Sequence, residues 1–292
     1  MSIKINKIIS NFETLIDLDY WNISLGLART SLAFGLLLTL LLNSNETLFS
    51  FGIENEILPE FNKYDFINIY NIVKDFTIAK YISIFVLILI IIGIYPRYTC
   101  IFHWWVTFSF FNTSFAIDGG DQINNILTLL LIPICITDNR KSHWKKSNSI
   151  NISFLKKSIA YFAFIIIEIQ VSLLYFQASV GKFKVIEWVN GTAIYYWFTN
   201  QSFGMNDLFY PFIMPLLKNP FSLTYITWSV LLLELFLFSC MFIHNKKVKR
   251  FAWYLGITFH LGIIFIHGLI SFFFSMLGAL TLYLITKKQK KL

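Results

Sequence analysis

Long, uninterrupted runs of apolar residues recur along almost the whole chain. Eight of them approach the roughly 20 residues that an α-helix needs to cross the hydrocarbon core of a bilayer. The runs cover residues 24–42, 78–95, 100–117, 122–136, 158–180, 222–243, 252–270 and 272–286. They are continuous rather than alternating, which argues against the strands of a transmembrane barrel. The fourth and eighth runs are short, and they are either tilted partners in a tight hairpin or incomplete spans.

The composition explains why these runs must face lipid. Hydrophobic residues make up 56% of the 292 positions and charged residues only 14%, whereas soluble domains carry about a quarter charged residues. A chain of this size cannot bury that much apolar surface within itself, so the bilayer must cover the excess. We therefore predict an all-α, polytopic transmembrane helical bundle of about eight spans, in a single domain over residues 1–292.

The placement of charge orients this bundle. Basic residues cluster at 140–146, 156–157, 246–250 and 287–291, and acidic residues dominate the 43–77 loop. With eight spans and cytoplasmic N- and C-termini, every basic cluster falls on the inner side, as the positive-inside rule requires. The net charge of +8 then reflects topology, and a nucleic acid partner is not expected because the basic groups flank spans instead of forming one face.

The same topology gathers chemically capable residues on the outer side. Asp118 and Asp121 lie in the turn between the third and fourth spans, and His267 ends the seventh span. Lys182 ends the fifth span and begins an amphipathic segment over 182–220, predicted to be extracytoplasmic. Three clusters that are distant in sequence are therefore predicted to converge on one outward-facing site.

Lys182 permits two interpretations. A lysine at the end of a span commonly extends to the interface as a snorkelling anchor. Alternatively, the aromatic residues near it, Tyr175 and Trp188 among them, could provide an apolar setting in which an amine acts as a base.

Asp118 and Asp121 flank two glycines, a pattern typical of a tight polar turn. Asp121 could also cap the helix that follows and face the cavity. Two aspartates without a nearby histidine are not a metal-ligand signature, so no metal site is predicted.

His260 and His267 are seven residues apart, which places them on one helix face about 10 Å apart. That separation excludes joint chelation of one metal ion. We expect His260 to be a hydrogen-bonded core residue, and His267, at the outer rim, to be the better candidate for proton transfer.

Charged residues inside spans are costly unless they are paired. Arg29 is therefore predicted to form an internal ion pair with Glu168 or Glu234. Cys100, Cys135 and Cys240 form no CxxC pair and fall near the inner side, so an outward-acting thiol–disulfide oxidoreductase is not expected.

A family resemblance follows from the spacing of Gln170, Tyr175, Lys182 and Trp188. The run Q-x4-Y-x6-K leading into W-x2-G at Gly191 resembles the vitamin K-dependent gamma-carboxylase and its HTTM relatives. Arg29, the 119–121 turn and the 260–267 segment also resemble HTTM positions. The stretch SFAIDGGDQINNILTLLLIPICITDNRKSHW resembles, more narrowly, the SdpB family of the sporulation-delaying protein system.

The resemblance implies a function and a location. It implies a protein of the bacterial cytoplasmic (inner) membrane that helps to produce a secreted SdpC-like antimicrobial peptide beside an SdpA-like partner. At the superfamily level it implies an outward-facing cavity, with Lys182 on the catalytic base position. Lys182, Asp121 and His267 become the candidate catalytic residues. The candidate binding or orienting residues are Gln170, Tyr175, Trp188, Asp118, His260 and Arg29.

Two functions remain open. The first is a membrane-embedded maturation enzyme, with a quinone-like or lipidic cofactor as an option. The second is a non-catalytic export or assembly factor that binds the peptide precursor and the SdpA-like partner. Vitamin K carboxylation does not follow from the resemblance, because no large lumenal domain like that of the carboxylase is expected here, and Asn124, Asn125 and Ile126 occupy the neighbourhood of its catalytic-centre histidine.

Overall fold

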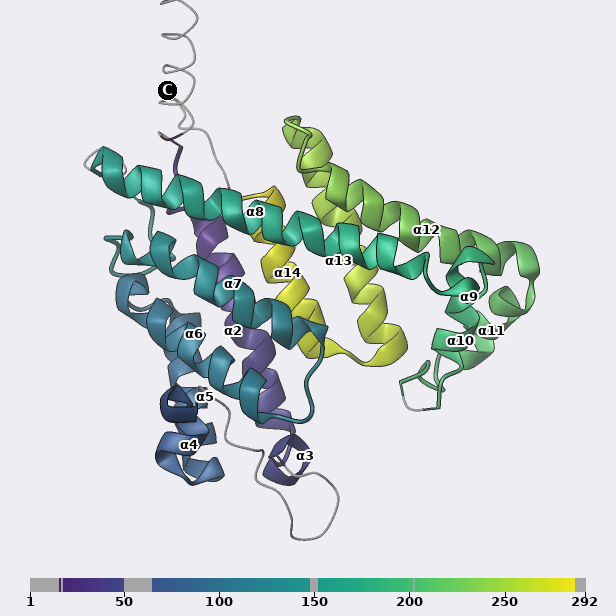
Figure 1. Ribbon diagram of the computed structural model, residues 1–292, viewed down its shortest axis with the longest axis horizontal. Coiled ribbons are helices and arrows are strands. Elements are labelled where there is room, and N and C mark those ends of the chain that lie inside the picture. The colour runs from purple at the N-terminus through teal and green to yellow at the C-terminus, as the bar shows by residue number, and fades with distance from the viewer. Residues whose placement is uncertain (1–15, 17, 50–64, 148–151, 202, 287–292) are drawn as a thin grey trace, which may run out of the picture.

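The computed structural model describes residues 16, 18–49, 65–147, 152–201 and 203–286. Ile94 and Ser142 form an isolated β-bridge, and the regular structure of the described residues is helical. Each of the eight predicted apolar runs forms a helix (Figure 1). These helices are α2 (Ile23–Leu42), α5 (Phe76–Ile92), α6 (Pro96–Thr113), α7 (Gly119–Ile136), α8 (Phe154–Lys182), α12 (Pro220–Ser239), α13 (Lys246–His267) and α14 (Ile270–Leu284).

Two sets of short helices connect them. The first set follows α2 and consists of α3 (Asn45–Phe49), η1 (Asp65–Ile67) and α4 (Ile69–Val73). The second set lies between α8 and α12 and consists of α9 (Ile186–Val189), α10 (Ala193–Phe198) and α11 (Tyr210–Lys218). The middle of the predicted acidic loop, residues 50–64, lies outside the described residues.

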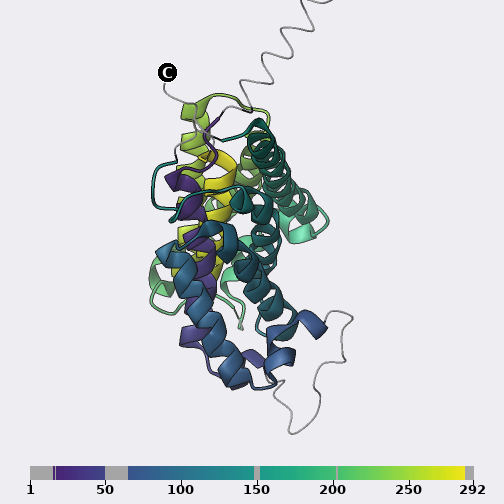
Figure 2. The same cartoon turned by 90° about the vertical axis from the view of Figure 1, so that its left-hand side faces the viewer.

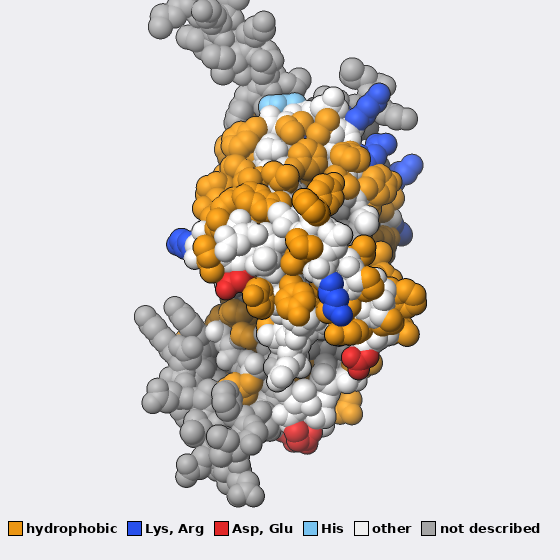
Figure 3. All heavy atoms as spheres, turned by 90° about the vertical axis from the view of Figure 1, so that its right-hand side faces the viewer, with side chains coloured by type: hydrophobic (Ala, Val, Ile, Leu, Met, Phe, Trp, Pro, Cys, Tyr) orange, Lys and Arg blue, Asp and Glu red, His pale blue; other side chains and the backbone are white. Residues whose placement is uncertain are grey.

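Four described helices are long and apolar enough to cross a membrane by length and composition: α2, α7, α8 and α12. Helices α5 and α14 are apolar but shorter. Hydrophobic side chains cover much of the described surface on the face drawn in Figure 3, as expected where lipid is the solvent. The chain is thus an all-helical integral membrane protein, and the count of eight spans remains a prediction.

Local sequence signals explain where the helices begin and end. The side chains of Asn22, Asp75 and Asn219 accept hydrogen bonds from the first backbone amides of α2, α5 and α12, satisfying donors that a helix leaves unpaired. Helices α5 and α13 end at glycines in the left-handed region, Gly93 (φ 87°) and Gly268 (φ 72°), a conformation that costs glycine little.

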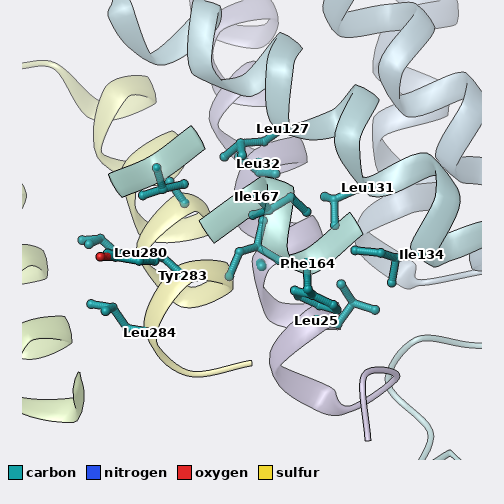
Figure 4. Close-up of a cluster of buried hydrophobic side chains, with 14 of the residues drawn as sticks. Leu25, Leu32, Leu127, Leu131, Ile134, Phe164, Ile167, Leu280, Tyr283 and Leu284 are labelled. Carbon is teal, nitrogen blue, oxygen red and sulfur yellow. The ribbon is translucent and has the colours of Figure 1, made fainter. Parts of the chain in front are cut away.

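The core forms around α2, which packs against α14 on one side and α5 on another. Its centre is a cluster of buried side chains from α2, α7, α8 and α14 (Figure 4). The members labelled there are Leu25, Leu32, Leu127, Leu131, Ile134, Phe164, Ile167, Leu280, Tyr283 and Leu284. Gly278 lets α14 approach α2 closely, since a Cβ there would meet Leu32 Cγ at 2.7 Å.

The connections between helices gather at two opposite ends. At one end Asn22 donates to the carbonyl of Thr286, and the amide of His143 donates to the carbonyl of Gly93 at 3.0 Å. At the other end Ser271 Oγ donates to Asp118 at 3.5 Å. Figures 1 and 2 show α3 and α4 at the bottom and the end of α14 at the top. The described ends of the chain therefore lie on the same side as the basic loop between α7 and α8. That this side is cytoplasmic stays a prediction.

Arg29 lies at the end that holds the basic loop, and its partners differ from those predicted. Its guanidinium donates to His143 Nδ1 at 3.1 Å and to Thr99 Oγ1 at 3.2 Å. Glu234 bonds to Lys182 instead, so the predicted pair of Arg29 with Glu234 is wrong. Because a guanidinium can only donate, this contact requires His143 Nδ1 to be unprotonated.

The His143 contact predicts a pH-dependent stability. Burial, together with the positive charges of Arg29 and Arg140, lowers the pKa of His143 from 6.5 to about 3. An unfolded chain would protonate this histidine below pH 6.5 while the folded protein would not, so stability is full above pH 6.5 and is lost as the pH falls toward 3. At pH 5.5 we expect a loss of about 1 kcal/mol.

Thermal unfolding in detergent at pH 8.0 and 5.5 measures this loss. A His143→Gln variant retains an acceptor for Arg29 but does not titrate at this position. Its unfolding temperature should therefore change less between pH 8.0 and 5.5 than that of the unmodified protein. Parallel pH profiles for the two proteins would contradict the prediction.

Candidate functional site

A cavity of about 840 Å³ opens between α8, α12 and α13, beside α9, α10 and the start of α14. Its walls are mainly aliphatic and aromatic, with Trp197, Phe198, Phe259 and Phe272 among them. This size is typical of a site for a small organic ligand, as is an apolar wall with a few convergent polar groups. The polar side chains that line it include Tyr175, Lys182, Glu234, His260 and His267.

Lys182 is the last residue of α8, and its side chain folds back along that helix. Nζ donates to the carbonyl of Ala178 at 3.0 Å and to Glu234 Oε1 and Oε2 at 2.6 and 2.8 Å. The ring centre of Trp188 lies 5.2 Å from Nζ, within the range of a cation–π contact. A snorkelling lysine at a helix end would extend outward, away from the helix. The Lys182 ammonium instead points one turn back, into the cavity.

Glu234 belongs to the site although the sequence suggested it only as a packing partner. It is the fifteenth residue of α12, buried, and held by both of its oxygens on Lys182. The two carboxylate oxygens hold Lys182 Nζ in place within the cavity wall. The sequence did carry a signal for Glu234. It is an acidic residue within an apolar span, and such residues usually face the protein interior and mark a functional site.

Tyr175 and His260 form a second polar pair in the cavity wall. Tyr175 Oη and His260 Nε2 lie 3.1 Å apart, and both residues are buried. Among the described residues, His260 Nδ1 has no hydrogen-bond partner. His260 is thus the hydrogen-bonded interior histidine that was expected, with one ring nitrogen left over.

His267 lies at the rim, where α13 ends. Its Nδ1 donates to the carbonyl of Phe203 at 2.7 Å, and its ring meets Phe198 edge-on. The amide of Asn206 donates to the carbonyl of Ile266 at 3.0 Å. These contacts hold the segment after α10 against the end of α13. His267 therefore forms one side of the cavity.

Asp118 and Asp121 form a capping box at the start of α7. Asp118 is the N-cap and accepts from the amides of Gly120 and Asp121 at 2.6 and 3.1 Å, while Asp121 Oδ2 accepts from the amide of Asp118 at 3.0 Å. Gly119 and Gln122 line the cavity, but the two aspartates are not among its described lining residues. Their bonds serve to start α7.

The remaining candidates divide between the cavity and other places. Trp188 lines the cavity, whereas Gln170, further back on α8, is not among its described lining residues. Arg29 lies at the opposite end of the bundle, with His143. Cys100, Cys135 and Cys240 are buried and unpaired as disulfides. The described residues contain no group of three or more His, Cys, Asp or Glu side chains that could hold a metal ion.

The fold and the cavity define a helical integral membrane protein whose polar site is built from a lysine–glutamate pair within an apolar wall. Comparison with known proteins agrees with this class, since the sequence pattern of the HTTM domain matches residues 21–287. The chain belongs to the HTTM family and is SdpB-like.

Two proteins from Bacillus subtilis (strain 168) are similar in sequence to this chain. Sporulation-delaying protein SdpB is 39% identical over 284 residues, covering 95% of this chain and 86% of that protein. The uncharacterized protein YitO is 35% identical over 266 residues, covering 90% of this chain and 85% of its own length. No solved structure matches the chain.

Proposed function

We propose that this protein is required to produce a secreted SdpC-like antimicrobial peptide in the bacterial cytoplasmic membrane, through chemistry that depends on Lys182. The similarity to SdpB supports the biological role. The observation that carries the chemical part is the Lys182 ammonium folded into the apolar cavity against Glu234. An interfacial anchor would need neither the cavity nor the buried carboxylate.

The lysine–glutamate pair can act by moving one proton. Transfer along the hydrogen bond from Nζ to a Glu234 oxygen leaves a neutral amine and a neutral carboxylic acid. An apolar wall favours that neutral pair more than water would, because burial penalises both charged forms. The neutral amine can then accept a proton from a substrate group in the cavity, which is general base catalysis.

The other polar side chains would orient the substrate. Tyr175 and His260 present a hydrogen-bonding pair within the same wall, and His267 lies at the rim. Asp121 would act on the substrate only indirectly, by holding the turn from which Gly119 and Gln122 reach the cavity.

A quinone-like or lipidic cofactor fits the cavity by size and chemistry. Flat aromatic walls such as Trp197, Phe198 and Phe272 would hold its rings or chain, and few polar groups would need to be paired. Such a group would supply redox or acyl-transfer chemistry, while Lys182 would hold or release the proton.

One observation favours a second candidate, a non-catalytic export or assembly factor working with an SdpA-like partner. The Lys182 ammonium already has three acceptor atoms, on Ala178 and Glu234. A fully bonded ion pair of this kind can serve to join α8 to α12 without any chemistry.

A Lys182→Arg substitution separates the two candidates. Arginine keeps the positive charge and can bind the Glu234 carboxylate, but it cannot release its proton at physiological pH. We expect the amount of mature secreted peptide to fall by roughly a hundredfold or more, within the range that a general base contributes. The measurement is mass spectrometry of culture medium from cells that express the precursor, the SdpA-like partner and either protein.

Membrane levels of the variant, followed by immunoblot, control for failed insertion. Undiminished mature peptide with Lys182→Arg would reject the base role and favour the assembly factor. Loss of mature peptide with accumulation of an unmodified precursor would support the enzyme.

A further inference from the structure

A second hollow lies far from the cavity, in the loop that joins α7 to α8. It has a volume of about 270 Å³, and its walls include Asn139, Lys141, Lys145, Lys146 and Ser147. We call this site the basic hollow. It lies at the end of the bundle where the described chain ends meet, opposite the turn that holds Asp118.

The loop around the basic hollow is held rigidly by Arg140. Its guanidinium makes a two-pronged contact with Asp138, at 2.8 to 3.1 Å, and donates to the carbonyls of His143 and Lys145 at 2.9 Å. The loop is also joined to the α5–α6 turn, where the amide of Tyr95 donates to the carbonyl of Lys141 at 2.9 Å. Arg140 is therefore a structural residue whose donors are turned inward.

The lysines of the hollow remain available to a ligand. Within the described part of the chain, the nearest acid in sequence, Asp138, is occupied by Arg140, and no salt bridge involves Lys141, Lys145 or Lys146. Three ammonium groups around a preformed hollow attract an anion with several oxygens, such as a phosphate.

The surroundings of the hollow indicate where that phosphate comes from. Ile152 forms part of its wall, and α8 begins directly afterwards with Phe154 and Leu155, which are 60% and 69% exposed. Trp144, in the same loop, is partly exposed and donates through Nε1 to the carbonyl of Ile91 at 3.1 Å. Exposed aromatic and aliphatic side chains beside lysines are typical of the level at which lipid headgroups meet acyl chains.

We propose that the basic hollow binds the phosphate headgroup of an anionic phospholipid, with the acyl chains lying along the exposed start of α8. If the basic residues served only to orient the protein in the membrane, their number alone would matter. The loop is instead shaped into a hollow by the inward-facing Arg140, and orientation does not require such a shape.

The test uses the full chain in nanodiscs made of phosphatidylcholine with graded amounts of phosphatidylglycerol. Lipid retained by the protein is counted by native mass spectrometry. The test variant is Lys145→Ala/Lys146→Ala, and the matched control is Lys247→Ala/Arg250→Ala, which removes the same charge from the first turns of α13. We expect the test variant to bind phosphatidylglycerol roughly tenfold more weakly or worse, and the control to change less than threefold.

Three results would overturn the proposal. Equal losses for both variants would mean that only net charge matters, and unchanged binding in the test variant would mean that the hollow is not the site. Inorganic phosphate that competes fully with phosphatidylglycerol at millimolar concentration would mean that the hollow takes a soluble anion. Equal thermal unfolding midpoints in pure phosphatidylcholine would show that the variants are folded.

Discussion

Replacement of both Lys182 and Glu234 by methionine is expected to leave a folded membrane protein that yields far less mature peptide. The two methionines fill a similar volume and pack against the apolar cavity wall, while no charge is left without its partner. Exchanges of buried ion pairs for apolar residues are often neutral or stabilising. Loss of the proposed base, by contrast, would lower the amount of mature peptide by about a hundredfold or more.

The single variants provide the contrast. Lys182→Met leaves the carboxylate of Glu234 buried without its partner. Glu234→Met leaves the ammonium of Lys182 without its carboxylate. Each single variant should therefore lower stability by about 3 kcal/mol. Thermal unfolding in detergent and peptide mass spectrometry are measured on all three proteins. A double variant that is stable and still produces mature peptide would show that the pair has no chemical role. A double variant less stable than either single variant would show that the cavity cannot accept an apolar pair.

Gly278→Leu is expected to have the largest effect on stability. A Cβ at this position would lie 2.7 Å from Leu32 Cγ and 3.1 Å from the carbonyl oxygen of Ala28. Leu32 is fully buried, and the backbone oxygen of Ala28 has no rotamer that would relieve the clash. Helix α14 would therefore have to move away from α2. We expect a loss of about 3 kcal/mol or more, at the upper end of the cost of overpacking.

Gly262→Leu is the matched control for Gly278→Leu. Gly262 is also a helical glycine, in α13, but a Cβ there would have no neighbour within 4 Å. The same substitution should leave stability unchanged or slightly raised, because leucine favours the helix more than glycine does. Unfolding by graded addition of sodium dodecyl sulfate to mixed micelles measures both. Similar midpoints for the two variants would contradict close packing of α14 on α2.

The helices could be predicted because each apolar run carries its own signal. A continuous hydrophobic stretch indicates a helix without reference to the rest of the chain. The caps Asn22, Asp75 and Gly93 set helix ends that lie one to three residues before those predicted. The contacts among helices could not be predicted in this way. The close approach of α14 to α2 depends on Gly278, which looks like any other glycine in a hydrophobic run.

The candidate site shows the same division between local and long-range information. The spacing of Tyr175, Lys182 and Trp188 predicted that these residues belong to the site, and all three line the cavity. Glu234 could be recognised only as a buried acid, and the wrong cation was assigned to it. Both Arg29 and Lys182 were plausible partners by charge, and only the antiparallel packing of α8 on α12 decides between them. Within that packing Ser179 donates to the carbonyl of Leu231 at 3.2 Å.

Helix α8 has 29 residues and is therefore about 43 Å long, while the hydrocarbon core of a bilayer is about 30 Å thick. A helix of this length has to tilt or extend beyond the lipid, and Figure 1 shows it strongly inclined to α2 and α14. Its tilt responds to hydrophobic mismatch, and Lys182 lies at its end. We therefore expect a change in membrane thickness to shift the end of α8, and with it the depth at which Lys182 lies in the membrane.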